Sequence, residues 1–241
     1  MSAAWQTEFV RWVAAWTAHL KTIGITTDRY AFYPMDEPQN DKDAETLYDT
    51  ARLIKQIDPA LQVFTTVGTF KVISNSNIKR LQEVVDIFQV GLDEIDQRNT
   101  ARLVAAGKKV WSYEAVDKRA DPHQFFRLQA WRAFRYGVSG IGFWAYADTG
   151  PSGTAWNDFD GVRPDFSVIY EGNNAIVSSK RWEAWREAAE DYELLLMASR
   201  KLKPGPESDD FAEKLDLVLK HPDDYSLFEE VRRYILETAS R

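Results

Sequence analysis

Apolar positions along the chain alternate between two spacings. Phe9, Trp12, Val13 and Trp16 recur at helical spacing before Gly24, and a compact apolar run, Tyr30–Met35, follows them. The first spacing is typical of an amphipathic helix and the second of a buried strand. The alternation continues to Asp148. It predicts helices over Ala4–Thr22, Asp43–Ile57, Asn77–Val85, Asp96–Gly107 and Gln124–Tyr136, and strands over Tyr30–Met35, Leu61–Gly68, Asp86–Gly91, Lys108–Ala115 and Gly140–Asp148.

The C-terminal third has a different pattern. A long loop, Thr149–Val177, precedes a predicted helix over Ser179–Leu202, which ends before Pro204. From Asp209 to the end the chain is charged and amphipathic, which predicts a helical tail. The expected domains are therefore a partial barrel over residues 1–203 and a C-terminal helical extension over residues 204–241.

Strands that alternate with helices indicate an α/β fold with a covered parallel sheet. A complete (β/α)8 barrel of the TIM type takes about 250 residues, whereas five strand–helix units here occupy only about the first 150 of 241 positions. We therefore expect the last five strands of such a barrel, the fourth being Tyr30–Met35 and the eighth Gly140–Asp148, followed by the C-terminal helices.

Five parallel strands cannot close a barrel, so the fourth and eighth strands would each present an unpaired edge. Three further strands are expected from an upstream part of the natural chain or from a second chain. The alternative is an open sheet covered by the Met1–Leu20 helix and the C-terminal helices.

The charge of the chain narrows the class of partner. A net charge of −7, with no run of Lys or Arg longer than two, argues against nucleic-acid or anionic-membrane partners. No apolar run approaches the roughly 18 residues of a membrane span, and Glu8 and Arg11 interrupt the region where a signal peptide has its apolar centre. The sequence does not assign the protein to a cellular compartment.

No cofactor or metal is expected. The chain has no cysteine, and no glycine-rich phosphate loop follows a predicted strand. His19, His123 and His221 lack the spacing of a metal site. The segment Asn157–Gly161 offers oxygen atoms but not the twelve-position calcium pattern.

Two adjacent carboxylates, Asp36 and Glu37, end the first predicted strand and precede Pro38. Catalytic groups of such barrels lie at the C-terminal ends of strands, and Pro38 favours an extended Glu37. Neighbouring carboxylates push their pKa values apart, which leaves one to donate a proton and one to stabilise a cation. That division suits cleavage of a glycoside. The alternative is that Asp36 caps a turn and Glu37 is solvated.

Aromatic side chains near several strand ends favour a carbohydrate partner, because aromatic rings stack on sugar faces. Trp144, Tyr146 and Asp148 alternate along the last predicted strand and so share one face. Filling of the core explains strand aromatics equally well. The candidate substrate-binding residues are Tyr33, Tyr113, Glu114, Trp144, Tyr146 and Asp148.

Four segments resemble the end of the catalytic domain of glycoside hydrolase family 123 and its uncharacterised relatives (domain of unknown function 4091). They lie within Tyr30–Ser199 and read YPMDEP, VWSYEA, FFRLQAWRAFRYGVSGIGFWAYAD and VIYEGNNAIVSSKRWEAWREAAEDYELLLMAS. The resemblance implies a (β/α)8 barrel and a β-N-acetylgalactosaminidase-like activity with substrate-assisted catalysis. It implies that Asp36 orients the acetamido group, that Glu37 is the general acid and base, and that Tyr113 and Trp144 wall the acetamido pocket.

Two other functions stay open at this point. One is a retaining glycosidase with Glu37 as acid and base and Glu114 as nucleophile, which requires carboxylates about 5 Å apart. The resemblance argues against it. The other is a non-catalytic barrel fragment that binds carbohydrate or a partner through its aromatic side chains.

Overall fold

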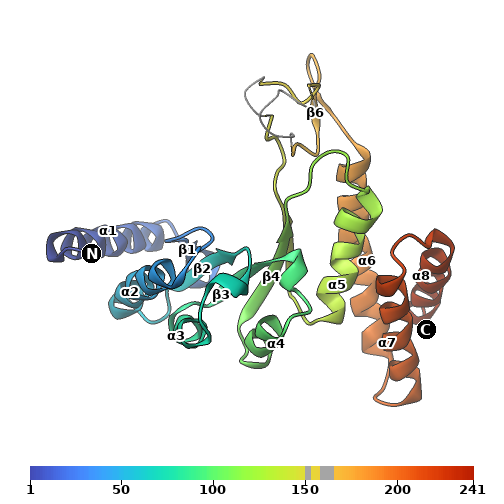
Figure 1. Ribbon diagram of the computed structural model, residues 1–241, viewed down its shortest axis with the longest axis horizontal. Helices are drawn as coiled ribbons and strands as arrows, with labels where there is room; N and C mark the ends of the chain where they lie inside the picture. The colour runs from blue at the N-terminus through green and yellow to red at the C-terminus, as the bar shows by residue number, and fades with distance from the viewer. Residues whose placement is uncertain (150–152, 158–165) are drawn as a thin grey trace. The chain divides into compact units, whose positions relative to one another are not determined.

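The structure is a computed structural model that describes residues 1–149, 153–157 and 166–241 (Figure 1). The chain forms two compact units, an N-terminal unit over Met1–Trp111 and a C-terminal unit over Ser112–Arg241. Each unit is described by itself. The expected boundary at residues 203–204 stays a prediction about the domains of the protein.

Five strands form one sheet in the order β1-β2-β3-β4-β5. They are β1 (Ala31–Phe32), β2 (Gln62–Val67), β3 (Ile87–Gly91), β4 (Lys109–Glu114) and β5 (Gly140–Phe143). β1 pairs in parallel with β2, with Phe32 level with Val63, and β2 pairs in parallel with β3. The expected five-stranded parallel sheet is confirmed, with β1 and β5 at opposite ends of the strand order. Closure into a (β/α)8 barrel stays a prediction about the whole protein.

Side-chain caps set where many helices begin. The N-terminal unit has α1 (Ala3–Thr22), α2 (Asp41–Ile57), α3 (Asn75–Val84) and α4 (Arg98–Ala105), with short 3-10 turns over Thr27–Arg29, Phe70–Val72 and Leu92–Glu94. The side chains of Ser2, Asn40 and Ser74 accept hydrogen bonds from backbone N–H groups in the first turns of α1, α2 and α3. Such caps satisfy donors that the helix itself leaves unpaired.

The core of the N-terminal unit follows the alternation of its strands. Val63, Thr65 and Val67 of β2 are fully buried, whereas Gln62 and Phe64, which alternate with them, are only partly buried, and Thr66 is buried as well. One face of β2 is therefore covered, and the other is half-exposed at Gln62 and Phe64 and covered at Thr66. The backbone approaches closely at the C-terminal ends of β2 and β3: a Cβ atom at Gly91 would lie 2.6 Å from the Gly68 carbonyl oxygen. Glycine at position 91 therefore permits this approach.

The C-terminal unit is largely helical. A π-helix over His123–Arg127 leads into α5 (Leu128–Arg135), and α6 (Lys180–Lys201), α7 (Pro206–Lys220) and α8 (Tyr225–Ala239) follow. A single apolar core joins these four α-helices, and it includes Trp131, Leu195, Leu215, Phe228 and Ile235. No helix among the described residues is long and apolar enough to cross a membrane.

Several sequence-based boundaries need correction. The strand expected over Tyr30–Met35 pairs only over Ala31–Phe32, since Pro34 has no N–H to donate. The strand expected over Gly140–Asp148 ends at Phe143. The predicted loop Thr149–Val177 contains an antiparallel pair, β6 (Tyr170–Glu171) and β7 (Ile176–Val177). The predicted helical tail is two helices, which the residues around Pro222 separate.

A buried carboxylate ties the helices of the C-terminal unit together. Asp191 of α6 is 1% exposed. Its carboxylate accepts hydrogen bonds from Arg127 Nε at 2.9 Å, Arg232 Nε at 2.8 Å and Trp131 Nε1 at 3.2 Å. These donors come from the π-helix, α8 and α5, so one carboxylate joins four elements.

We expect Asp191→Asn to lower the free energy of unfolding by about 3 kcal/mol, because the partly buried guanidinium groups of Arg127 and Arg232 lose the buried carboxylate that they share, although Arg127 keeps its pair with Glu187. Chemical denaturation followed by circular dichroism measures the change. Glu190→Gln is the matched control, since Glu190 is exposed and pairs with Arg186 on the surface of α6, where a pair contributes at most about 1 kcal/mol. Equal losses in the two variants would contradict the assigned role of Asp191.

Candidate active site

The predicted catalytic pair lies in the loop after β1, beyond the end of that strand at Phe32, on the C-terminal side of the sheet. Asp36 is exposed and Glu37 is partly buried, and the loop that carries them leads into α2. Two consecutive threonines of the neighbouring strand hold this loop. Thr65 Oγ1 donates to the Met35 carbonyl oxygen at 3.1 Å, and Thr66 Oγ1 donates to Asp36 Oδ1. β2 therefore positions the residues that follow β1.

The hydroxyl group of Thr66 is the centre of the arrangement. Besides its bond to Asp36, Thr66 Oγ1 lies 2.7 Å from Tyr33 Oη and accepts a hydrogen bond from the Glu37 backbone N–H at 3.0 Å. The Tyr33 hydroxyl also donates to Asp36 Oδ1. Thr66 itself is only 8% exposed. One buried hydroxyl thus contacts both residues of the carboxylate pair and the predicted binding residue Tyr33.

The backbone at Glu37 differs from the extended conformation predicted before Pro38. Glu37 has φ of 41°, which lies in the left-handed region that residues with a side chain seldom adopt. Its N–H donates to Thr66, and its carbonyl oxygen accepts from Gln39 Nε2 at 2.7 Å. These hydrogen bonds hold a conformation that costs about 1–3 kcal/mol. Strain of this kind concentrates at functional sites.

The pKa values of Glu37 and Tyr33 are both raised at this site. Partial burial, and secondly the neighbouring charge of Asp36, raise the pKa of Glu37 above its ordinary value. Burial, together with the hydrogen bond to Asp36, raises the pKa of Tyr33 to about 12. Tyr33 therefore keeps its proton at neutral pH, and its hydroxyl group donates a hydrogen bond to Asp36. The raised pKa of Glu37 favours a proton donor at this position.

Aromatic rings continue from this loop across the half-exposed face of the sheet. The ring of Tyr33 lies 4.7 Å from that of Phe64, and Phe64 lies 5.5 Å from Trp111, measured between centroids. Tyr33 is 48% exposed, so its ring is available to a ligand while its hydroxyl is held. The N-terminal unit thus combines two carboxylates with neighbouring aromatic rings.

The sequence analysis did not identify Thr66, or a third carboxylate, Glu94, as part of this end of the sheet. Glu94, just after β3, is 4% exposed and accepts a hydrogen bond from Thr69 Oγ1 at 2.6 Å. Thr69 follows β2, so Glu94 also lies at the C-terminal end of the sheet. The predicted strand Leu61–Gly68 did contain Thr66, but threonine is common in strands and carries no chemical signal by itself.

The remaining predicted site residues lie in the C-terminal unit. Tyr113 and Glu114 end β4, and Trp144, Tyr146 and Asp148 follow β5. The backbone N–H of Trp144 donates to the Glu114 carbonyl oxygen at 2.8 Å, and Trp144 Nε1 donates to Asp148 Oδ2 at 2.9 Å. The fold therefore brings the ends of these two strands together.

The prediction that Trp144, Tyr146 and Asp148 share a strand face does not hold, because β5 ends at Phe143. Strand alternation therefore does not extend to these three residues. The indole N–H of Trp144 reaches Asp148 across a turn of the chain instead. Tyr146 packs edge-on against Trp182 of α6, with ring centroids 5.4 Å apart. Trp144 is 56% exposed and is the most accessible aromatic ring of this group.

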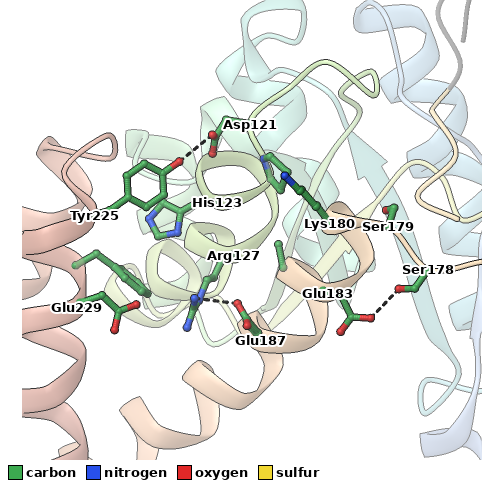
Figure 2. A pocket seen from close by; sticks show the side chains of 13 residues that line it. Asp121, His123, Arg127, Ser178, Ser179, Lys180, Glu183, Glu187, Tyr225 and Glu229 are labelled. Atoms are coloured by element: carbon green, nitrogen blue, oxygen red, sulfur yellow. Dashed lines mark hydrogen bonds and ion pairs between the residues drawn. The ribbon is translucent and has the colours of Figure 1, made fainter.

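A cavity of about 530 Å³ in the C-terminal unit contains none of the predicted site residues (Figure 2). His123, Tyr225 and Phe228 give it aromatic walls, and Arg127 pairs with Glu187 at 2.8 Å beside it. Among the described residues no three His, Asp or Glu side chains gather as a metal site does. Most of the weak calcium candidate, Asn157–Gly161, falls outside the described residues.

Comparison with known proteins identifies the family. The model of the glycoside hydrolase 123 catalytic domain matches residues 1–198, which include both carboxylates and every other predicted site residue. A comparison with curated proteins found no match. The match spans most of the chain, so this protein is a glycoside hydrolase that belongs to the glycoside hydrolase 123 catalytic-domain family.

Proposed function

We propose that the protein cleaves a terminal 2-acetamido-2-deoxyhexoside, as a β-N-acetylgalactosaminidase does, by substrate-assisted catalysis with retention of configuration. The observation that carries the proposal is the unequal pair after β1. Asp36 is held by Thr66 and Tyr33, whereas Glu37 beside it has a raised pKa. One carboxylate is fixed to stabilise charge, and the other is suited to transfer a proton.

In the first step, the carbonyl oxygen of the substrate's own acetamido group attacks C1 and forms a bond to it. The bond between C1 and the glycosidic oxygen breaks, and Glu37 gives its proton to the leaving oxygen. Asp36 accepts a hydrogen bond from the acetamido N–H and stabilises the positive charge of the oxazolinium that forms. The hydroxyl groups of Thr66 and Tyr33 keep the Asp36 carboxylate oriented for this contact.

In the second step, water attacks C1 from the face that the leaving group vacated. Glu37, now a carboxylate, removes a proton from the water, and the bond between C1 and the acetamido oxygen breaks. Two inversions at C1 give net retention. The proton that Glu37 lost in the first step is restored, so both carboxylates end in their starting states.

The C-terminal unit supplies residues suited to bind the sugar. The exposed ring of Trp144 and the side chain of Tyr113 would contact the acetamido group, and Tyr33, Glu114, Tyr146 and Asp148 would complete the binding residues. The hydrogen bond from Trp144 Nε1 to Asp148 supports this assignment, because it fixes the orientation of an accessible indole ring.

Removal of either carboxylate tests the proposal most directly. In the full-length protein, Glu37→Gln and Asp36→Asn should each lower kcat/KM on an aryl 2-acetamido-2-deoxyglycoside by about 10²- to 10⁴-fold, as loss of a general acid or its electrostatic partner does. Glu45→Gln, an exposed carboxylate of α2, is the control and should have no effect. A near-normal rate in either site variant would refute the roles assigned here. Unmodified protein that binds sugars but hydrolyses no aryl glycoside would favour the non-catalytic alternative.

The pH dependence tests the electrostatic relation within the pair. Glu37 must be protonated to act as the acid, so kcat/KM falls as the pH rises through its raised pKa. Burial and the charge of Asp36 both raise this pKa, and Asp36→Asn removes only the second cause. The alkaline limb of the residual activity should therefore move to lower pH in Asp36→Asn. A limb that stays in place or moves upward would show that another group titrates there.

The choice of substrate separates the two retaining mechanisms. An aryl glycoside without the 2-acetamido group should be inert, and a thiazoline mimic of the oxazoline should inhibit strongly, as analogues of the transition state do. With Glu114 as nucleophile, Glu114→Gln would abolish turnover, and azide would restore it with a glycosyl azide as product. That second result would replace the substrate-assisted mechanism.

A further inference from the structure

The first turn of α6 borders a second cavity of the C-terminal unit, of about 520 Å³. Asp121, Pro122, Ser179 and Lys180 line it and also line the neighbouring cavity, where Figure 2 labels Asp121, Ser179 and Lys180. Four cationic side chains and one anionic side chain contribute to the lining: Lys118, Arg119, Lys180, Arg181 and Asp121. The cavity is therefore positively charged, although the whole chain carries a net charge of −7.

Arg181 is the most informative of these residues. It is 6% exposed, yet the hydrogen bonds of its guanidinium group go to neutral partners. Nη1 donates to the Lys118 carbonyl oxygen at 3.0 Å, and Nη2 donates to the Ser167 carbonyl oxygen at 3.1 Å and to the Tyr170 hydroxyl at 3.3 Å. Its Nε is buried without a hydrogen-bond partner. Buried charges are normally paired, because an uncompensated charge away from water is costly.

The other cations differ in how far they are engaged. Arg119 is paired with Asp117 at 2.6 Å, and Lys118 donates to the Ala155 carbonyl oxygen. Asp121 accepts from the Gln124 backbone N–H at 2.8 Å and from the Tyr225 hydroxyl at 3.0 Å. Lys180 is exposed on the first turn of the helix. Arg181 and Lys180 are therefore the cations best placed to compensate a ligand's charge.

The N-terminus of α6 adds to the positive electrostatic potential of this cavity. α6 is 22 residues long, and Ser179 caps the N–H of Trp182. The remaining N–H groups of the first turn have no partner within the helix and, with the helix dipole, favour an anion there. The carboxylate that this turn already carries, Glu183, pairs with Arg186 and accepts from the Ser178 hydroxyl group. The N-terminus of α6, the buried guanidinium group of Arg181 and the exposed ammonium group of Lys180 therefore border the same cavity.

We propose that this cavity binds a compact oxyanion, and that its natural ligand is a sulfate ester or a carboxylate group on an acidic glycan. The glycan part rests on the proposed function, since only a protein that binds carbohydrate would meet an oxyanion attached to a sugar. Guanidinium and ammonium groups suit the oxygen atoms of both anions. Arg181 also connects the cavity to a predicted binding residue, because Ser167, which accepts from Arg181, donates through its Oγ to the Asp148 carbonyl oxygen at 3.0 Å.

The test uses inorganic sulfate and the full chain. Sodium sulfate should raise Tm above the value in sodium chloride of equal ionic strength, and the part of this rise that is lost in Lys180→Gln measures binding at the site, because sulfate also stabilises folded proteins in general. Lys180→Gln should weaken sulfate binding about fivefold, as expected for an exposed charge. The matched control is Lys201→Gln, which removes the same charge from the other end of α6 and should leave binding unchanged.

Arg181→Lys is the second variant, and it should weaken sulfate binding by about tenfold, because it keeps the charge and loses the planar donor group. Its Tm in chloride shows whether it folds, and Lys180→Gln gives an independent result if it does not. Equal stabilisation by sulfate and chloride would overturn the proposal, as would equal weakening in Lys180→Gln and Lys201→Gln.

Titration with sugars separates the two sources of the anion. A 2-acetamido sugar with a sulfate ester, a uronic acid and a neutral 2-acetamido sugar are compared in the inactive Glu37→Gln variant. Tighter binding of either acidic sugar, lost in Lys180→Gln, supports the glycan assignment and names the anion. Equal binding of all three overturns it. Because these measurements need no turnover, they are independent of the failure or success of the proposed hydrolysis.

Discussion

The hydroxyl group of Thr66 is the contact on which the candidate active site depends. Parallel pairing of β1 with β2 places the two threonines of β2 beside the chain that leaves β1. Thr65 then binds the Met35 carbonyl oxygen, and Thr66 binds the Asp36 carboxylate and the Glu37 N–H. A loop that would otherwise be free to rearrange is fixed at three consecutive residues by two side chains of a buried strand.

The same contacts explain how adjacent carboxylates can have different roles. A left-handed backbone at Glu37 turns the chain between the two side chains, so neighbours in sequence need not point the same way. Asp36 is bound by two hydroxyl groups, whereas burial and the charge of Asp36 act on Glu37. The hydrogen bonds of Thr66 therefore hold the strained backbone and the Asp36 carboxylate, while burial and the charge of Asp36 raise the pKa of Glu37.

The C-terminal unit contains two buried charges that are compensated in opposite ways. Asp191 receives hydrogen bonds from two guanidinium groups and one indole, which satisfies its charge within the fold. Arg181, ten residues earlier on the same helix, binds two carbonyl oxygens and a hydroxyl. The first arrangement is typical of a structural ion network. The second leaves positive charge beside a cavity, which is the physical basis for an anion as ligand.

The sequence by itself determined the order of helices and strands, since hydrophobic spacing, caps such as Asn40 and glycines such as Gly107 act locally. It also predicted that Asp36 and Glu37 lie at the C-terminal side of a strand of a parallel sheet, although that strand ends at Phe32 and the pair lies in the loop that follows. It could not determine the conformation of Glu37, because local preference before Pro38 favours an extended backbone and a distant side chain, Thr66, overrides it. Nor could it identify Glu94 or Arg181 as buried charges, since burial and partners depend on residues far away in the chain. Only the tertiary structure decided the conformation of Glu37 and the burial of Glu94 and Arg181. The hydrogen bonds that fix these residues join strands and loops that are far apart in sequence, and no periodic pattern of the sequence predicts such contacts.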